Sequence, residues 1–388
     1  MAIGEKVSGT IESIAAGGAG ILRWQGKTLF VDYTAPGDRI SAVIEEENPT
    51  WARASLQKLH EASQIRVESP CPYYQRCGGC TLQHISYEAQ LQIKKQLLLD
   101  HFTRIGAIEQ LPSINMIYSE SYGYRNRMQF HRVAKPKSGQ SRVGLKARSS
   151  EAVLPIETCP IADEGIQRAL QRKELVPPPA LDRFTVYSRS GTFLQEGKQQ
   201  RGTVRLLGAT LQMDAGVFFQ SNGQVLEKLL MAVRSVAEQA DRSLPAGDLY
   251  SGVGTFAYFI QDLFPALDLM EENHKALALA KENITNRGAR FFPISDEHWA
   301  KQAVKKTQTQ HYGFMVLDPP RQGLSPALRD FLCTSGPPLI AYVSCDPATQ
   351  ARDCKGLVQA GYTLESLDLY DFYPQTAHME SLAVLRRA

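Results

Sequence analysis

From about residue 214 onward, short apolar runs alternate with segments of helical periodicity, and this alternation constrains the fold more than any other feature. Strands that alternate with helices form parallel sheets with helices on both faces, a doubly wound α/β arrangement. Ligands of such open sheets bind at the carboxyl ends of the strands. The residues that directly follow each predicted strand are therefore the candidates for chemistry.

One predicted strand ends at a cysteine. The apolar run 338–343 leads through Ser344 to Cys345, and Asp346 and Pro347 then supply the cap and the first residue of a helix. A thiolate in that position gains from the positive end of the helix, so the sequence predicts a nucleophile with a lowered pKa at Cys345. The alternative is a small, buried and unreactive cysteine.

A glycine turn follows the predicted strand at 247–250. Gly252 and Gly254 precede Thr255, and the third glycine of the dinucleotide-binding pattern is missing. Small residues with an acid before the turn suit S-adenosylmethionine, which has no pyrophosphate to cradle. Glu271 ends the next predicted strand, where an acid can bind a ribose diol.

Four of the seven cysteines have a spacing typical of metal ligands. Cys71, Cys77 and Cys80 lie within ten residues, and Cys159, followed by a proline, is a fourth candidate. Four thiolates suit one metal centre, which can be zinc or an iron–sulfur cluster, and their spacing does not separate the two.

Two stretches of the sequence indicate RNA binding. Residues 1–60 alternate apolar and polar residues between glycine turns, which predicts a small β-barrel and resembles the TRAM domain, an OB-like barrel attached to RNA-modifying enzymes. Residues 121–150 contain eight Lys or Arg and no Asp or Glu, with aromatic residues between them, and 121–131 predicts a strand presenting Arg125 and Arg127. Positive charges that bind phosphates and aromatic rings that stack on bases suit single-stranded RNA. The alternative for residues 1–60 is a barrel without a ligand, and the alternative for residues 121–150 is a solvated charged face.

The amino-acid composition argues against a membrane protein. It is that of an ordinary globular protein, with 43% hydrophobic and 21% charged residues, and the length of 388 residues predicts two or three domains. No apolar run approaches the roughly 20 residues of a membrane helix, and the N-terminus has no signal-peptide pattern. The sequence thus predicts a cytoplasmic protein without disulfides.

Six motifs in order resemble the RumA/TrmA-type RNA (uracil-C5)-methyltransferase family over nearly the whole chain. They are the four cysteines, Phe218-Phe219-Gln220-Ser221-Asn222, Asp248-Leu249-Tyr250-Ser251-Gly252-Val253-Gly254, Asp318-Pro319-Pro320-Arg321, Ser344-Cys345-Asp346-Pro347 and His378-Met379-Glu380-Ser381. The resemblance implies a TRAM-like barrel at 1–60, a central α+β domain at 61–211 and a Rossmann-like class I methyltransferase domain at 212–388. It also implies a structural [4Fe–4S] cluster on the four cysteines.

The resemblance assigns roles to single residues. Cys345 is the implied nucleophile and Glu380 the general base, and Phe218 lies where the family handles the flipped base. The implied S-adenosylmethionine contacts are Gln220, Tyr250, Thr255, Glu271, Asp296 and Asp318. Thr255 and Asp296 depart from the family, since the member compared has Asn at both places.

The chemistry explains these residue types. C5 of uracil is a poor nucleophile, and a thiolate added at C6 creates an enolate whose C5 can take a methyl group. A base must then remove the C5 proton so that the thiolate is expelled. C6 cannot be reached within a stacked helix, so the uridine must be flipped out.

The resemblance favours 23S ribosomal RNA as partner, leaves a tRNA T-loop uridine open, and implies neither a membrane nor an obligate protein partner.

Three alternative functions fit the sequence less well. A radical enzyme would need Cys-x-x-x-Cys-x-x-Cys, and a silent RNA-binding protein would have lost Cys345 or Glu380. A cytosine-C5 methyltransferase would place Pro, not Ser, before the nucleophile.

Overall fold

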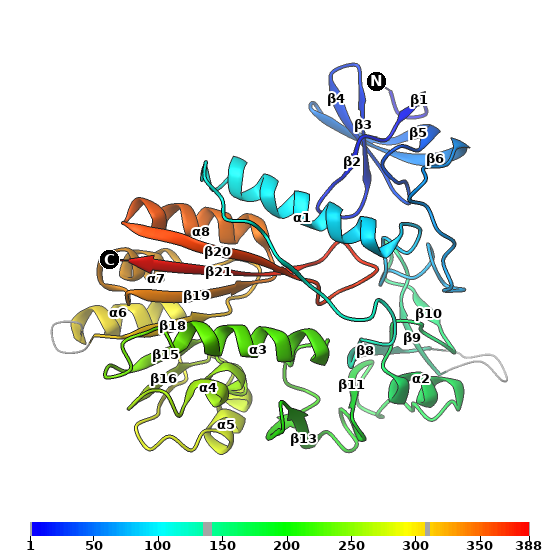
Figure 1. The fold of residues 1–388 in the computed structure, drawn as a ribbon. Helices are drawn as coiled ribbons and strands as arrows, with labels where there is room; N and C mark the ends of the chain where they lie inside the picture. The colour runs from blue at the N-terminus through cyan, green and yellow to red at the C-terminus, as the bar shows by residue number, and fades with distance from the viewer. Residues whose placement is uncertain (1, 135–141, 307–310, 388) are drawn as a thin grey trace.

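The structure is a computed structural model that describes residues 2–134, 142–306 and 311–387. Within these ranges the chain forms a six-stranded N-terminal sheet, a five-stranded central sheet, a two-stranded hairpin and an eight-stranded C-terminal sheet. Figure 1 shows these parts in chain order, from the blue N-terminal strands through the green central region to the C-terminal sheet.

The N-terminal sheet curves around its own core. Its strand order is β1-β5-β6-β4-β3-β2, and β4 and β6 form the parallel pair. Register shifts between β5 and β6 mark bulges, which increase the bend of a sheet. Val7, Leu29 and Ile40 belong to the buried cluster inside this curve. The predicted β-rich N-terminal region is therefore present, while its relation to TRAM domains stays a prediction. The strands are β1 (Lys6–Thr10), β2 (Ser13–Ile14), β3 (Gly20–Trp24), β4 (Lys27–Val31), β5 (Arg39–Glu47) and β6 (Trp51–Glu61).

The central sheet is antiparallel, in the order β10-β9-β8-β11-β12, and is covered by α2. Its core contains Phe130 and Phe184, together with Cys80 and Cys159. The strand predicted at 121–131 begins later, at Arg127, because the chain bends through residues 121–123. Two residues of the basic stretch, Lys135 and Lys137, lie outside the described residues. The elements are β8 (Arg127–Arg132), β9 (Val143–Lys146), β10 (Val153–Pro155), α2 (Glu164–Gln171), β11 (Arg183–Arg189) and β12 (Thr192–Gln195).

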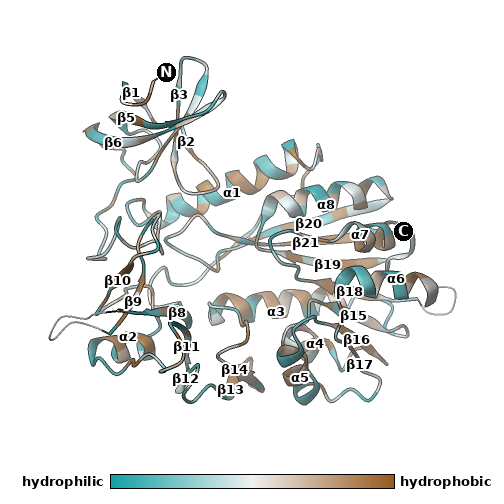
Figure 2. Cartoon of the chain, turned by 180° about the vertical axis from the view of Figure 1, so that it is seen from behind, coloured by the Kyte–Doolittle hydropathy of each residue, from teal (hydrophilic) through white to brown (hydrophobic). Residues whose placement is uncertain are grey.

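The C-terminal sheet confirms the predicted doubly wound α/β arrangement. Its order is β17-β16-β15-β18-β19-β21-β20-β7; the first five strands are parallel, and β21 is antiparallel to both of its neighbours. Every residue of β15, β16, β18 and β19 is buried, as expected for strands covered on both faces. Figure 2 shows the apolar colour of these inner strands. The strands are β7 (Met116–Ile117), β15 (Ala246–Leu249), β16 (Leu267–Met270), β17 (Arg290–Phe292), β18 (Phe314–Leu317), β19 (Leu339–Ser344), β20 (Tyr362–Tyr370) and β21 (Glu380–Arg387).

Helices cover both faces of this sheet. One buried cluster joins the sheet to α3, α4 and α5, and a second cluster joins it to α1, α6, α7 and α8. The helices are α1 (Tyr87–Arg104), α3 (Gly223–Ala237), α4 (Thr255–Ile260), α5 (His274–Asn283), α6 (Asp296–Lys306), α7 (Pro326–Ser335) and α8 (Pro347–Gln359). Helix α1 buries Leu91, Leu98 and Phe102.

Parts of the chain expected in the central domain pack on the C-terminal sheet instead. Leu98 and Phe102 of α1 lie in its second cluster, and β7 adds an edge strand parallel to β20. The hairpin of β13 (Arg201–Leu206) and β14 (Ala209–Asp214) packs on its first cluster, so the expected boundary at 211/212 falls inside β14. Among the described residues, no helix combines the length and the apolar character needed to cross a bilayer.

Candidate active site

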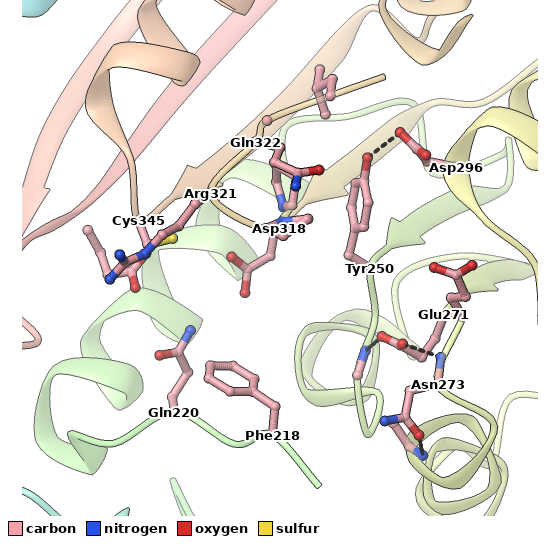
Figure 3. A pocket seen from close by; sticks show the side chains of 18 of the residues that line it. Phe218, Gln220, Tyr250, Glu271, Asn273, Asp296, Asp318, Arg321, Gln322 and Cys345 are labelled. Carbon is pink, nitrogen blue, oxygen red and sulfur yellow. Dashed lines mark hydrogen bonds between the residues drawn. The ribbon is translucent and has the colours of Figure 1, made fainter. Parts of the chain in front are cut away.

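The residues that follow the parallel strands enclose a cleft of about 1160 Å³. The cleft lies where the strand order reverses, with β16 and β17 on one side of β15 and β18 and β19 on the other. Loops diverge at such a switch point, and ligands of open α/β sheets bind there. The predicted site residues that line the cleft are Arg125, Phe218, Gln220, Tyr250, Glu271, Asp296, Asp318, Cys345 and Glu380. Figure 3 shows Cys345 at one end of the cleft and Glu271 at the other, with Asp318 and Phe218 between them.

Cys345 follows the buried strand β19, as predicted, and Asp346 caps α8. The predicted fall in its pKa is wrong: burial, followed by the carboxylates of Glu380 and Asp318, raises the pKa of Cys345 to about 12. The backbone amides of Ala348 and Thr349, in the first turn of α8, donate to the Asp346 side chain at 3.1 and 3.0 Å. The cap therefore takes up the helix amides on which the expected stabilisation of the thiolate depended.

Glu380 is the first residue of β21 and is 3% exposed. Its Oε2 has no hydrogen-bond partner among the described residues. Burial and the nearby Asp318 carboxylate raise the pKa of Glu380 well above its usual value, and the Arg321 guanidinium acts in the opposite direction. A carboxylate in such surroundings is a stronger base than one in water.

Asp318 stands directly after β18, and its side chain lies between Cys345 and Tyr250 in the cleft (Figure 3). Burial raises its pKa to about 7, and a hydrogen bond from the Gln220 side chain acts against this rise. Gln220 is itself buried, and its Oε1 has no partner among the residues described. A free amide oxygen at the wall of the cleft is available to a ligand.

The glycine turn after β15 is held in an unusual backbone conformation. Tyr250, Gly252 and Gly254 have φ values of 66°, 56° and 79°, and a Cβ at Gly254 would lie 3.3 Å from Ala280 Cβ. The Tyr250 hydroxyl donates to Asp296 Oδ2 at 2.6 Å. A non-glycine residue at positive φ is costly, so this hydrogen bond helps to keep Tyr250 in place.

Acidic side chains brace the same turn. Glu271 accepts the Gly252 amide at 3.0 Å and the Asn273 amide at 2.6 Å, one on each carboxylate oxygen. Below the turn, the fully buried Asp248 accepts the Ala257 amide at 2.8 Å, and burial raises its pKa to about 7. Each oxygen of Glu271 keeps a lone pair for a ligand hydroxyl, so the carboxylate suits a ribose diol.

Two predicted contacts lie away from the cleft wall. Thr255 is the first residue of α4 and does not line the cleft, and Arg127 does not line it either. The Arg127 guanidinium instead lies 5.7 Å from the centre of the Phe218 ring and donates to the Val217 carbonyl at 3.2 Å. Phe218 remains 61% exposed, so its ring is free to meet a ligand.

Sequence reasoning missed Tyr373 and Thr376, which also line the cleft. Burial, followed by the Glu380 carboxylate, raises the pKa of Tyr373 to about 12, and the neighbouring Cys345 acts in the same direction. Both residues precede the motif 378–381, which contains Glu380, and this proximity in sequence was the signal that could have found them.

The four cysteines gather on the side of the central domain that faces the cleft, and Gly78 and Gly79 between them line it. Cys80 and Cys159 are buried, and burial raises their pKa to about 11 and about 12, with the other cysteines contributing. The Gly79 amide donates to Cys77 Sγ at 3.4 Å. Within the described residues, however, no group of three or more His, Cys, Asp or Glu side chains has an arrangement that could hold a metal ion. The donor set fits a thiolate-bound metal in number and chemistry, but the thiols do not form a finished coordination sphere.

Residues 208–388 match the family model described as tRNA (Uracil-5-)-methyltransferase. The 23S rRNA (uracil(1939)-C(5))-methyltransferase RlmD of Acidithiobacillus ferrooxidans is 31% identical, over 97% of this chain and 96% of that protein. An uncharacterized RNA methyltransferase of Treponema denticola is 32% identical, over 93% and 94%. The solved structure of the Pyrococcus abyssi tRNA (uracil-54, C5)-methyltransferase with S-adenosyl-L-homocysteine is 26% identical, has a TM-score of 0.73, and covers 98% of this chain and 100% of that one.

Proposed function

Because the chain belongs to the RNA (uracil-C5)-methyltransferase family, we propose that it methylates C5 of a particular uridine in structured RNA through a covalent bond between Cys345 and C6. It is an RNA (uracil-5-)-methyltransferase that uses S-adenosylmethionine. The observation that carries the finer proposal is that Cys345, Glu380 and Asp318 share one cleft at the switch point of the sheet.

The proposed reaction begins at Cys345. The Cys345 thiol releases its proton to solvent, and the thiolate forms a bond to C6 of the flipped uracil while an electron pair moves through C5 to O4. S-adenosylmethionine, when bound, supplies the methyl group that this electron pair takes up at C5. Glu380 then accepts the C5 proton, the C5–C6 double bond forms again, and the electron pair of the S–C6 bond returns to sulfur.

The charges in the cleft suggest separate roles for Arg321 and Asp318. Arg321 lowers the pKa of both Cys345 and Glu380, so it favours the charged form of each group when it is needed. Asp318, whose pKa is about 7, can hold a proton at neutral pH and donate it to a uracil carbonyl, or position the donor.

We assign the S-adenosylmethionine site to the far end of the cleft. Glu271 is the candidate for the ribose diol, and Tyr250, Asp296 and Gln220 surround the remaining space. Thr255 has the weakest support, because it does not line the cleft.

The uridine would enter from the side of the exposed Phe218 ring, on which a flipped base can stack. Arg125 lines the cleft beside it and is a candidate for a phosphate contact, with Arg127 behind the ring. We propose 23S ribosomal RNA as the substrate, since the RlmD relative is a methyltransferase of 23S rRNA. A tRNA uridine is the second candidate, because the family model and the Pyrococcus abyssi structure carry tRNA in their descriptions.

The remaining domains would serve this reaction. Residues 1–60 are proposed as a TRAM-like RNA-binding barrel, and residues 212–388, extended by α1, β7 and the β13–β14 hairpin, as the methyltransferase unit; the rest of 61–211 is proposed as the central domain. We infer that Cys71, Cys77, Cys80 and Cys159 hold a structural [4Fe–4S] cluster, supported by the four thiols and the amide bonded to Cys77. Anaerobically purified protein should contain iron and sulfide, and Cys159→Ala should lose both; one zinc without iron would contradict the inference.

The test of the mechanism separates the two catalytic residues. Cys345→Ala should bind RNA and S-adenosylmethionine and yield neither adduct nor product. Glu380→Gln should accumulate a covalent, already methylated protein–RNA complex, seen as a shifted band on a denaturing gel that depends on S-adenosylmethionine. The double variant should lack that band. Normal turnover by Glu380→Gln without a band would remove Glu380 from the mechanism and leave Asp318 or His378 as the base.

A further inference from the structure

The segment 371–379 joins β20 to β21 and delivers Glu380 to the cleft. It also contributes Tyr373, Thr376 and His378 to the cleft wall. The segment contains neither helix nor strand, so no ladder of backbone hydrogen bonds fixes its course. Its position depends on single contacts to other parts of the chain.

A buried ion pair from α1 holds the start of this segment. Lys94 Nζ lies 2.6 Å from Asp371 Oδ1, and both side chains have no exposed surface. Lys94 Nζ also donates to the Tyr373 carbonyl at 3.0 Å, and the Tyr87 hydroxyl donates to Asp371 Oδ2 at 2.9 Å. One ammonium group thus fixes the first residue of the segment and the backbone of a residue that lines the cleft.

A second contact from α1 holds the middle of the segment. Gln375 has φ of 68°, a left-handed conformation that costs a non-glycine residue free energy. The Gln90 side chain accepts the Gln375 amide at 3.0 Å and donates to Gln375 Oε1 at 2.9 Å. The Thr81 and Leu82 amides donate to the Gln375 carbonyl at 3.1 and 3.0 Å. Figure 1 shows this segment passing below the N-terminal half of α1.

We propose that Lys94 is a positioning residue for the base, which holds segment 371–379 so that Glu380 reaches the C5 proton; this inference rests on the proposed function of Glu380. A fully buried lysine is a poor choice for stability alone, because an apolar residue of similar size avoids the cost of desolvating the charge. Its three donors instead suit a junction between a carboxylate and a carbonyl.

Lys94→Met tests the proposal, because methionine keeps most of the length of the side chain and removes its charge. We expect a fall in kcat of at least about tenfold with little change in KM for RNA, since a small displacement of a base slows only the step that it performs. The methylated covalent complex should accumulate, as in Glu380→Gln. A variant that is merely less stable would lose adduct and product in the same proportion.

The matched control is Arg66→Met, which removes the cation of a second ion pair outside the cleft, Arg66–Asp38, whose carboxylate has no exposed surface and whose arginine is half-buried. It should lower the denaturation temperature and leave the ratio of adduct to product unchanged. If Lys94→Met does not fold, Tyr87→Phe removes a single hydrogen bond from Asp371 and should show a smaller but measurable adduct fraction.

The outcomes separate the inference from the function on which it rests. If Glu380→Gln traps the adduct and Lys94→Met, or Tyr87→Phe in its place, keeps the wild-type ratio, the positioning role is wrong and the base assignment stands. If Glu380→Gln traps nothing, both the base assignment and the positioning role fall.

Discussion

Replacing Asp248 with asparagine should stabilise the protein by an amount that grows with pH. The Asp248 side chain is fully buried on β15 below the glycine turn, and its Oδ1 has no partner among the described residues. Its Oδ2 accepts the Ala257 amide, and the amide oxygen of an asparagine can accept the same hydrogen bond. The substitution therefore removes the charge and keeps the contact.

The magnitude follows from the rise in the pKa of Asp248 from 3.8 to about 7, which burial causes. Below pH 3.8 both the folded and the unfolded state hold the proton, and the group has no effect on stability. Between pH 3.8 and 7 the unfolded state releases the proton first, so stability falls as the pH rises, and above pH 7 the loss is constant. One pKa unit corresponds to about 1.4 kcal/mol, so the full loss is about 4 kcal/mol, of which about 3 kcal/mol develops between pH 5 and pH 8.

The assay is urea unfolding at pH 5 and pH 8, followed by the fluorescence of Trp299. Trp299 is 2% exposed in the core of the C-terminal sheet, so its emission reports on that domain. Parent and variant both carry Trp24→Phe and Trp51→Phe, which remove the other two tryptophans. The difference in unfolding free energy should grow by about 3 kcal/mol from the lower to the higher pH.

Asp268→Asn is the matched control. Asp268 is a buried carboxylate on the neighbouring strand β16, but it is paired with Arg290 and accepts the Tyr312 hydroxyl. Its loss should destabilise the protein, the opposite sign from Asp248→Asn. A gain for Asp248→Asn that is equal at both pH values, or a loss at both, would refute the reasoning.

Gly254→Ala should weaken S-adenosylmethionine binding measured by calorimetry, because φ is 79° there and a left-handed alanine costs about 1–2 kcal/mol; unchanged affinity would contradict this. Arg125→Ala should lower RNA affinity and reduce its salt dependence by about one phosphate contact, without changing the affinity for S-adenosylmethionine in the same titrations. Adduct formation on RNA carrying 5-fluorouridine should accelerate by roughly tenfold per pH unit between pH 6 and 8, because the pKa of Cys345 is about 12 and only the thiolate reacts; a plateau below pH 8 would show that RNA binding lowers that pKa. Deleting residues 1–60 should weaken RNA binding in filter assays and leave residual turnover on a short hairpin, and full activity on the long substrate would remove the barrel from recognition.

The local sequence was sufficient to predict the strand ends that form the cleft. The run before Cys345 is wholly apolar and stops at Asp346-Pro347, so both the strand and its last position could be predicted. The same holds for Asp318, because a short apolar strand and a double proline bracket it. These features depend on neighbours within a few residues, which one sequence contains in full.

Pairings across the chain could not be predicted. Lys94 has the helical spacing of α1, and its burial follows only from Asp371, which is 277 residues away in sequence. The prediction for the pKa of Cys345 was wrong for the same reason, because the sequence shows the helix that would lower it but neither the burial of the thiol nor the carboxylate of Glu380 brought beside it. The antiparallel insertion of β21 between β19 and β20 brings Glu380 beside Cys345, whereas Lys94 meets Asp371 where α1 packs against the end of β20.

That insertion also determines the order of events during synthesis. Strand β21 is synthesised after β19 and β20, yet it lies between them in the sheet. Each of these two strands therefore has an unpaired edge until residues 371–387 have been added. A nascent chain halted at residue 370 would carry its N-terminal and central sheets, an open strand edge and a lysine without its carboxylate. A premature stop codon in this short stretch should therefore yield a chain that chaperones hold and proteases degrade, and not a shortened enzyme.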